Sequence, residues 1–196
     1  MLKNVLKLVV LGVIGFGILV FATAKEPENI KTNNVNSSAI KLSTLPSSFE
    51  LVGKDDKVSR DSLFKSGSKT LVIVGNHDSL SVVKDLPKFY DLKIPYVMVA
   101  NISAAPWFVK KMFIPSKLEE LNKGSNIPMI YDFEGDTVKA LGVTDNAKTS
   151  YIAYLVDENG NISKIAKGSV KEGALDGSMN EEEKKASLAP LSEYLK

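Results

Sequence analysis

Lys69–Phe89 reads KTLVIVGNHDSLSVVKDLPKF, and this stretch decides the fold class. Its apolar run, Lys69–Val74, is typical of a strand that is buried on both faces. The polar residues that follow predict a loop, and we expect Asp78 or Ser79 to cap the next helix. That helix is predicted to run to about Tyr90, because apolar residues recur at helical spacing along it. A buried strand, a loop and a helix therefore form one unit of an α/β domain.

Strands and helices continue to alternate on both sides of this unit. Strands are predicted over Phe49–Val52, Tyr96–Ala100, Ile127–Tyr131, Ser150–Val156 and Asn161–Lys167. Helices are predicted over Arg60–Phe64, within Pro106–Lys123, over Thr137–Leu141 and after Asn180. Asn159-Gly160 favours a hairpin between the last two strands, because both residues tolerate positive φ. This order predicts a mixed sheet with helices on both faces.

The amino end of the chain carries an export pattern. Lys3 and Lys7 precede the unbroken apolar and glycine run Leu8–Phe21, and small residues follow as far as Ala24. This predicts a signal peptide over residues 1–24, cleaved after Ala24, and a periplasmic or secreted protein. An uncleaved membrane anchor is the alternative, although a spanning helix needs about 20 apolar residues. We expect a polar linker over residues 25–48 and one domain over residues 49–196.

Composition excludes several classes of function. Both basic residues before Lys25 lie in the leader, and from Lys25 onward basic and acidic residues balance, which argues against nucleic-acid binding. The chain has no cysteine, one histidine and one arginine. Disulfides, thiol chemistry and thiolate metal sites are therefore excluded, and histidine-rich metal sites are excluded as well. The sequence predicts no metal site and no cofactor.

The strand, loop and helix of Lys69–Phe89 resemble the first βα unit of the thioredoxin fold, with Pro87 at the place of that family's helix proline. YIAYLVDENGNI, which begins at Tyr151, is similar to the family's later hairpin. GDTVKALGV, which begins at Gly135, resembles the preceding segment of peroxiredoxin-type members. The resemblance implies a thioredoxin-like fold of the peroxiredoxin or TlpA type, with a mixed central sheet flanked by helices. The helical insert and the cysteine-free loop also resemble the exported YtfJ-type family.

The chain departs from this family at the residues that carry its chemistry. The resemblance places the family's Cys-x-x-Cys on Ser79–Val82, where no sulfur is present. Because thiol–disulfide exchange requires a thiolate, thiol oxidoreductase and peroxidase activities are excluded. The family's cis-proline falls on Tyr151, after Ser150, and a cis bond at a non-proline residue costs about 3–4 kcal/mol. We therefore expect a trans bond there and predict no catalytic residue.

The loop at the end of the Lys69–Val74 strand is the first candidate site. His77, Asp78 and Ser79 are residue types that serve in catalysis, and α/β sheets place ligands at this end of their strands. With Ser150 and Tyr151 they are our candidates for ligand binding. Capping and turn formation are the favoured explanation of Asp78 and Ser79. An enzyme with non-thiol chemistry at this loop is the alternative function.

The helical insert is the second candidate site. Trp107, Phe108, Met112 and Phe113 lie close together with two adjacent lysines. Aromatic residues with methionine mark partner-binding surfaces, and a basic amphipathic helix can also lie on a membrane. The alternative is an ordinary helix that packs these side chains into the core. The sequence favours an exported, redox-inactive protein that binds a protein, a peptide or a small ligand. A protein or peptide partner is expected, and contact with a membrane only through an uncleaved leader.

Overall fold

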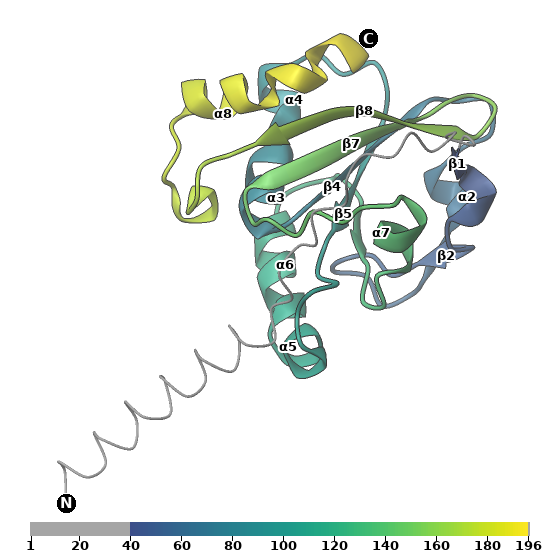
Figure 1. Cartoon of the computed structure of the whole chain (residues 1–196), viewed down its shortest axis with the longest axis horizontal. Coiled ribbons are helices and arrows are strands. Elements are labelled where there is room, and N and C mark those ends of the chain that lie inside the picture. The colour runs from purple at the N-terminus through teal and green to yellow at the C-terminus, as the bar shows by residue number, and fades with distance from the viewer. Residues whose placement is uncertain (1–39, 196) are drawn as a thin grey trace, which may run out of the picture. The chain divides into compact units, whose positions relative to one another are not determined.

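The computed structural model describes residues 40–195. Six strands form one sheet in the order β1-β8-β7-β4-β5-β6. Their bounds are β1 Ile40–Lys41, β4 Thr70–Gly75, β5 Tyr96–Ala100, β6 Met129–Tyr131, β7 Ser150–Val156 and β8 Asn161–Ser169. β4 runs parallel to β5 and antiparallel to β7, and β7 is antiparallel to β8. Strands β8, β7, β4 and β5 thus have the order and directions of the thioredoxin fold, and the predicted fold class is confirmed (Figure 1).

Helices cover both faces of this sheet. The helices are α2 Arg60–Leu63, α3 His77–Val83, α4 Leu86–Phe89, α5 Trp107–Met112, α6 Ile114–Asn122, α7 Asp136–Ala140 and α8 Glu181–Leu188. Short 3-10 turns are η1 Leu42–Thr44, η2 Ala174–Asp176 and η3 Ala189–Tyr194, and a small hairpin pairs β2 Ser48–Phe49 with β3 Val58–Ser59. Within residues 40–195, no helix is long and apolar enough to cross a membrane.

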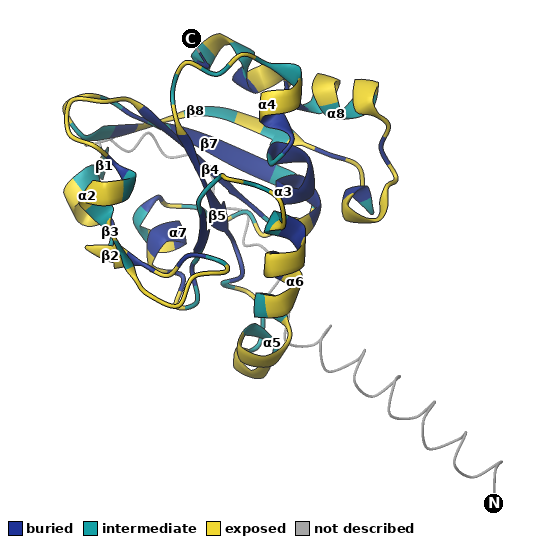
Figure 2. Cartoon of the chain, turned by 180° about the vertical axis from the view of Figure 1, so that it is seen from behind, coloured by how far each residue is buried: buried dark blue, intermediate teal, exposed yellow. Residues whose placement is uncertain are grey.

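Alternate side chains of β4 fill two separate cores. Leu71 and Ile73 pack in a cluster with side chains from α3, α4, α6 and α8. Val72 and Val74 pack on the opposite face, in a cluster that includes residues of α7 and β2. All six residues of β4 are buried, which explains why the strand reads as an unbroken apolar run (Figure 2).

The predicted helix after this strand is two helices. α3 ends at Val83 and α4 begins at Leu86, whereas the sequence predicted one helix as far as Tyr90. Pro87 explains the break, because proline has no N–H to donate to the carbonyl of Val83 and its ring clashes with that carbonyl. The hydroxyl of Tyr96 donates instead to the carbonyls of Val83 and Lys84, at 3.3 and 3.4 Å.

The hairpin between β7 and β8 forms where it was predicted, but with a different turn. Gly160 has φ +72°, and no residue other than glycine in the described chain has positive φ. Asn159 therefore does not take the conformation that the sequence suggested. The carboxylate of Asp157 accepts hydrogen bonds from the backbone N–H groups of Asn159 and Asn161 and shapes the turn.

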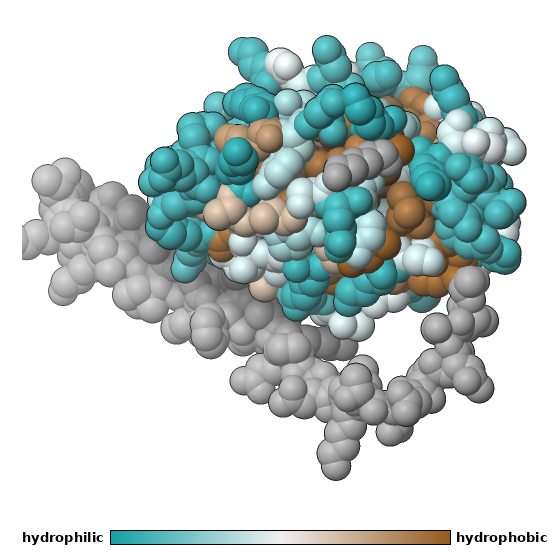
Figure 3. Space-filling view, turned by 90° about the horizontal axis from the view of Figure 1, so that it is seen from above, coloured by the Kyte–Doolittle hydropathy of each residue, from teal (hydrophilic) through white to brown (hydrophobic). Residues whose placement is uncertain are grey.

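The predicted linker, residues 25–48, includes residues that belong to the folded domain. β1 pairs with β8, and Leu45 is buried in the core. Arg60 holds this segment, because its guanidinium donates to the carbonyls of Ser43 and Leu45. The predicted signal peptide and the first part of the linker lie outside the described residues. The face seen from above carries many hydrophilic side chains, with apolar ones between them (Figure 3).

Candidate functional site

The first candidate site begins where β4 ends and α3 starts. Asn76, not Asp78 or Ser79, occupies the N-cap position of α3. The hydroxyl of Ser79 accepts from the backbone N–H of Asn76 and donates to its carbonyl, both at 3.0 Å. Ser79 is fully buried, so its hydroxyl serves the start of the helix.

His77 and Asp78 point to different surroundings. His77 is exposed to solvent, whereas Asp78 is buried. The carboxylate of Asp78 accepts hydrogen bonds from the backbone N–H groups of Gly173 and Leu175, each at 3.1 Å. Asp78 therefore ties the segment that precedes α8 to α3. No hydrogen bond joins His77 to Asp78 among the described contacts, and the pair does not form a general base with its orienting partner.

Ser150 and Tyr151 serve the packing of the sheet. The hydroxyl of Ser150 donates to the carbonyl of Ala147 at 3.4 Å. Tyr151 is fully buried, and its hydroxyl donates to the carbonyl of Ser187 at 2.7 Å. Burial raises the pKa of the Tyr151 phenol well above its ordinary value. The peptide bond before Tyr151 is trans, as expected.

The carboxyl ends of β4 and β5 are covered by the loop that precedes β7. The side-chain amide of Asn76 donates to the carbonyl of Asn146 at 2.9 Å, and that of Asn101 donates to the carbonyl of Asp145 at 3.0 Å. Burial acts to raise the pKa of Asp145, but hydrogen bonds from Lys167, from the backbone N–H of Ala147 and from the Ser150 hydroxyl outweigh it, and the pKa lies below its ordinary value. The loop of Asp145 and Asn146 is therefore held against the carboxyl ends of β4 and β5 by the side-chain amides of Asn76 and Asn101.

The cavities of the described chain lie away from these residues. One hollow of about 760 Å³ is lined by the segment that connects α4 to β5. Two others, of about 190 and 480 Å³, lie between the loop after β2 and α6. Within residues 40–195, no group of three or more histidine, aspartate or glutamate side chains is placed to hold a metal. None of these three hollows is lined by His77, Asp78, Ser79, Ser150 or Tyr151.

The second candidate site is a surface patch on and beside α5. We call Trp107, Phe108, Met112 and Phe113 the α5 patch. Their exposed fractions are 63%, 37%, 70% and 53%, respectively. The alternative that these side chains pack into the core is therefore wrong. Figure 2 shows α5 mostly in the colour of exposed residues, whereas the central strands and α3 are buried.

Contacts on its inner side hold α5 in place. The hydroxyl of Tyr131, at the end of β6, donates to the carbonyl of Lys110. The ammonium of Lys110 donates to the carbonyl of Phe133 at 2.9 Å and lies 5.6 Å from the centre of that ring. Burial, and to a lesser degree the charge of Glu50, raises the pKa of Tyr131, which keeps this phenol neutral and able to donate. The α5 patch is thus presented by an anchored helix.

Sequence reasoning missed the residues that anchor α5. Tyr131 and Phe133 lie about twenty positions from the helix, and no pattern in the sequence joins them to it. It also missed Leu175, a large apolar side chain that is 42% exposed and lies outside the α5 patch. The ammonium of Lys111 lies 5.0 Å from the centre of the Trp107 ring, in a cation–π contact. The only sequence signal for this contact is that the two residues are four positions apart on a helix.

Comparisons with known proteins found similar solved structures but no matching family model and no curated relative. The chain is similar to an uncharacterized conserved protein from Geobacillus kaustophilus (15% identity, 83% of each chain covered, TM-score 0.48). It is also similar to peroxiredoxin Q from Xanthomonas campestris (15% identity, 82% of this chain and 99% of that one, TM-score 0.47). A third similar structure is a putative thiol:disulfide interchange protein DsbE from Chlorobium tepidum (15%, 81% and 97%, TM-score 0.45). At this identity, the chemistry of these proteins does not carry over to this chain.

Proposed function

We propose that this chain is an exported, redox-inactive binding protein, and that the α5 patch is its binding surface. One observation carries the proposal: Trp107, Met112 and Phe113, three large apolar side chains, are each more than half exposed on and beside one short helix. Large exposed apolar patches on soluble domains mark sites of interaction. Tryptophan and other aromatic residues also contribute most of the binding energy at many interfaces.

The former active-site region supports the same proposal by offering no competing chemistry. The chain has no cysteine, and the serine at the first cysteine position, Ser79, is fully buried. Asp78 is committed to backbone N–H groups, and His77 stands alone at the surface. Non-thiol chemistry at this loop, the alternative from the sequence, finds no second catalytic group there.

Export and family membership complete the proposal. The leader pattern of residues 1–24 supports a periplasmic or secreted location, with attachment to the membrane if the leader is retained. The resemblance to the exported YtfJ-type family is in line with this location. A protein or a peptide is one class of partner for the α5 patch, because aromatic residues and methionine are enriched at protein–protein interfaces.

A capture experiment tests the proposed function. Immobilised full-length chain, the Trp107→Ala/Phe113→Ala variant and a Leu175→Ala control are exposed to the cell-envelope fraction. Leu175 is a matched control because it is also an exposed large apolar side chain. We expect components that bind to the wild type and to Leu175→Ala, and that are lost from the double variant. Equal capture by all three proteins would show that the α5 patch is not the binding surface.

A further inference from the structure

We propose that the α5 patch docks on the surface of an anionic lipid bilayer. This inference rests on the proposed function, because it takes the α5 patch as the binding surface and names what that surface contacts. Three features of the described chain favour a lipid surface: the sign of the charge around the patch, the shape of the region that carries it, and the position of its lysines.

The chain segment that carries the α5 patch has only basic charges, and the carboxylates of Glu50 and Glu119 line a hollow together with Pro115 and Tyr131. The chain has no acidic residue between Asp91 and Glu119, and this interval contains Lys110, Lys111 and Lys117. A surface with apolar side chains and positive charge is complementary to negatively charged headgroups, to which each nearby lysine contributes about 1 kcal/mol. The same charge disfavours a second copy of this chain, because two α5 patches that face each other would bring lysines together.

The shape of the region also favours a lipid surface. α5 lies at the end of the domain that is remote from α8, at the bottom of Figure 1. None of the four patch side chains lines the three hollows described above, and all four are exposed at this end of the domain. An exposed aromatic end needs a surface that can deform around it, which the headgroup region of a bilayer provides.

The lysines of α5 are placed for such an orientation. Lys111 lies against the ring of Trp107, so its ammonium stays beside the indole that would enter the headgroup region. Tryptophan is enriched at membrane interfaces, where its ring is buried and its N–H finds polar partners. Lysine places its apolar stem along such a surface and its charge among the phosphates. Tyr131 holds the helix from the inner side, so docking requires no new order in α5.

The fluorescence of Trp107 tests this inference in the full chain. Trp107 is the only tryptophan of the protein, so its emission reports on the α5 patch and not on the apolar leader. The protein is mixed with vesicles of equal parts phosphatidylcholine and phosphatidylglycerol, or with vesicles of phosphatidylcholine alone. We expect a blue shift, and quenching by brominated lipid, with the anionic vesicles, and a smaller response at high salt.

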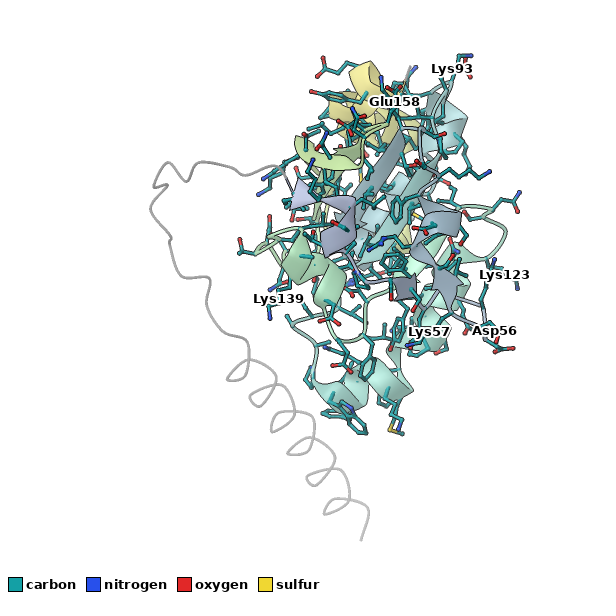
Figure 4. All side chains as sticks on the ribbon, turned by 90° about the vertical axis from the view of Figure 1, so that its right-hand side faces the viewer. Asp56, Lys57, Lys93, Lys123, Lys139 and Glu158 are labelled. Carbon is teal, nitrogen blue, oxygen red and sulfur yellow. The ribbon has the colours of Figure 1, made fainter. Side chains whose placement is uncertain are left out.

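Paired variants identify the side chains responsible. Lys111→Gln is expected to weaken binding to the anionic vesicles about fivefold, from the contribution of one lysine. Phe113→Ala is expected to weaken vesicle binding about tenfold, because it removes most of an aromatic side chain that docking would bury in the bilayer. Lys139→Gln and Leu175→Ala are the controls and should leave binding unchanged. Lys139 is exposed and lies on α7, outside the α5 region (Figure 4).

The outcomes separate this inference from the proposed function. Vesicle binding without a change in Trp107 emission would mean that the leader alone contacts lipid, and it would overturn the inference. An equal response to neutral and anionic vesicles would refute the role of charge. If vesicles leave Trp107 unchanged but a captured protein shifts its emission, the patch binds protein: the proposed function would stand and the lipid inference would fall.

Discussion

Replacing Gly168 with alanine should destabilise the domain through a single contact. Gly168 pairs with Tyr151 across β7 and β8. A Cβ at Gly168 would lie 2.2 Å from both Cζ and the hydroxyl oxygen of Tyr151, well inside van der Waals contact. The ring has little room to move, because Tyr151 is fully buried and its hydroxyl is bonded to the carbonyl of Ser187. The new methyl group must therefore displace the ring or the strand.

The size of the effect follows from these contacts. Overpacking a core position costs about 1–3 kcal/mol. Displacing the Tyr151 ring also breaks its hydrogen bond to Ser187, which contributes about 1 kcal/mol. We therefore expect Gly168→Ala to lower the free energy of unfolding by about 2–4 kcal/mol. With a urea m-value of about 2 kcal/mol/M, the unfolding midpoint falls by roughly 1–2 M.

Urea unfolding of a double-mutant cycle tests this reasoning. Tyr151→Leu removes the ring atoms that collide with the new Cβ, so Gly168→Ala should cost less than about 1 kcal/mol in that background. Ser169→Ala, at an exposed neighbouring position on β8, is the control and should have little effect. A cost of Gly168→Ala that is the same in both backgrounds would refute the account of this contact.

Further predictions concern the loop at the carboxyl end of β4 and the buried phenols. Asp78→Ala should lower the free energy of unfolding by about 2 kcal/mol, because two N–H groups lose a charged acceptor, and Asp78→Asn should lower it by less; urea unfolding measures both. His77→Ala should change it by less than about 0.5 kcal/mol in the same assay, because His77 is exposed. Burial raises the pKa of Tyr154 to about 12. In the unfolded chain this phenol ionises near pH 10. The contribution of the protonated Tyr154 to the free energy of unfolding is therefore fully present below about pH 10 and is lost as the pH rises through about 12. Tyr154→Phe should flatten that decline in urea unfolding at increasing pH, and an unchanged slope would contradict it.

Local patterns in the sequence were sufficient where one segment determines its own structure. Tyr96–Ala100 and Ser150–Val156 were predicted with the bounds that the structure shows, because continuous apolar runs identify buried strands. α8 begins after Asn180, as predicted, and Asn180 forms a capping box with Glu183 there. The helix ends at Leu188, two residues before Pro190, and η3 follows it.

Contacts between distant segments determined what the sequence could not show. Ile40–Lys41 has no strand pattern of its own and is ordered by pairing with β8, while Arg60 holds the residues that follow. The burial of Asp78 depends on a segment almost one hundred positions away. The exposure of the α5 patch depends on which side of α5 faces Tyr131. The spacing of apolar residues shows that they share one side of the helix, but not whether that side faces the core or the solvent.

The most direct test of the account compares two exposed positions in living cells. A photoreactive amino acid is placed at Met112, in the α5 patch, or at His77, at the start of α3, and the cells are irradiated. Both positions are exposed, so neither substitution needs to disturb the core. The account predicts covalent adducts, with lipid or with protein, from Met112 and not from His77. Adducts from His77 alone would contradict it and would return the function of the chain to the carboxyl end of β4.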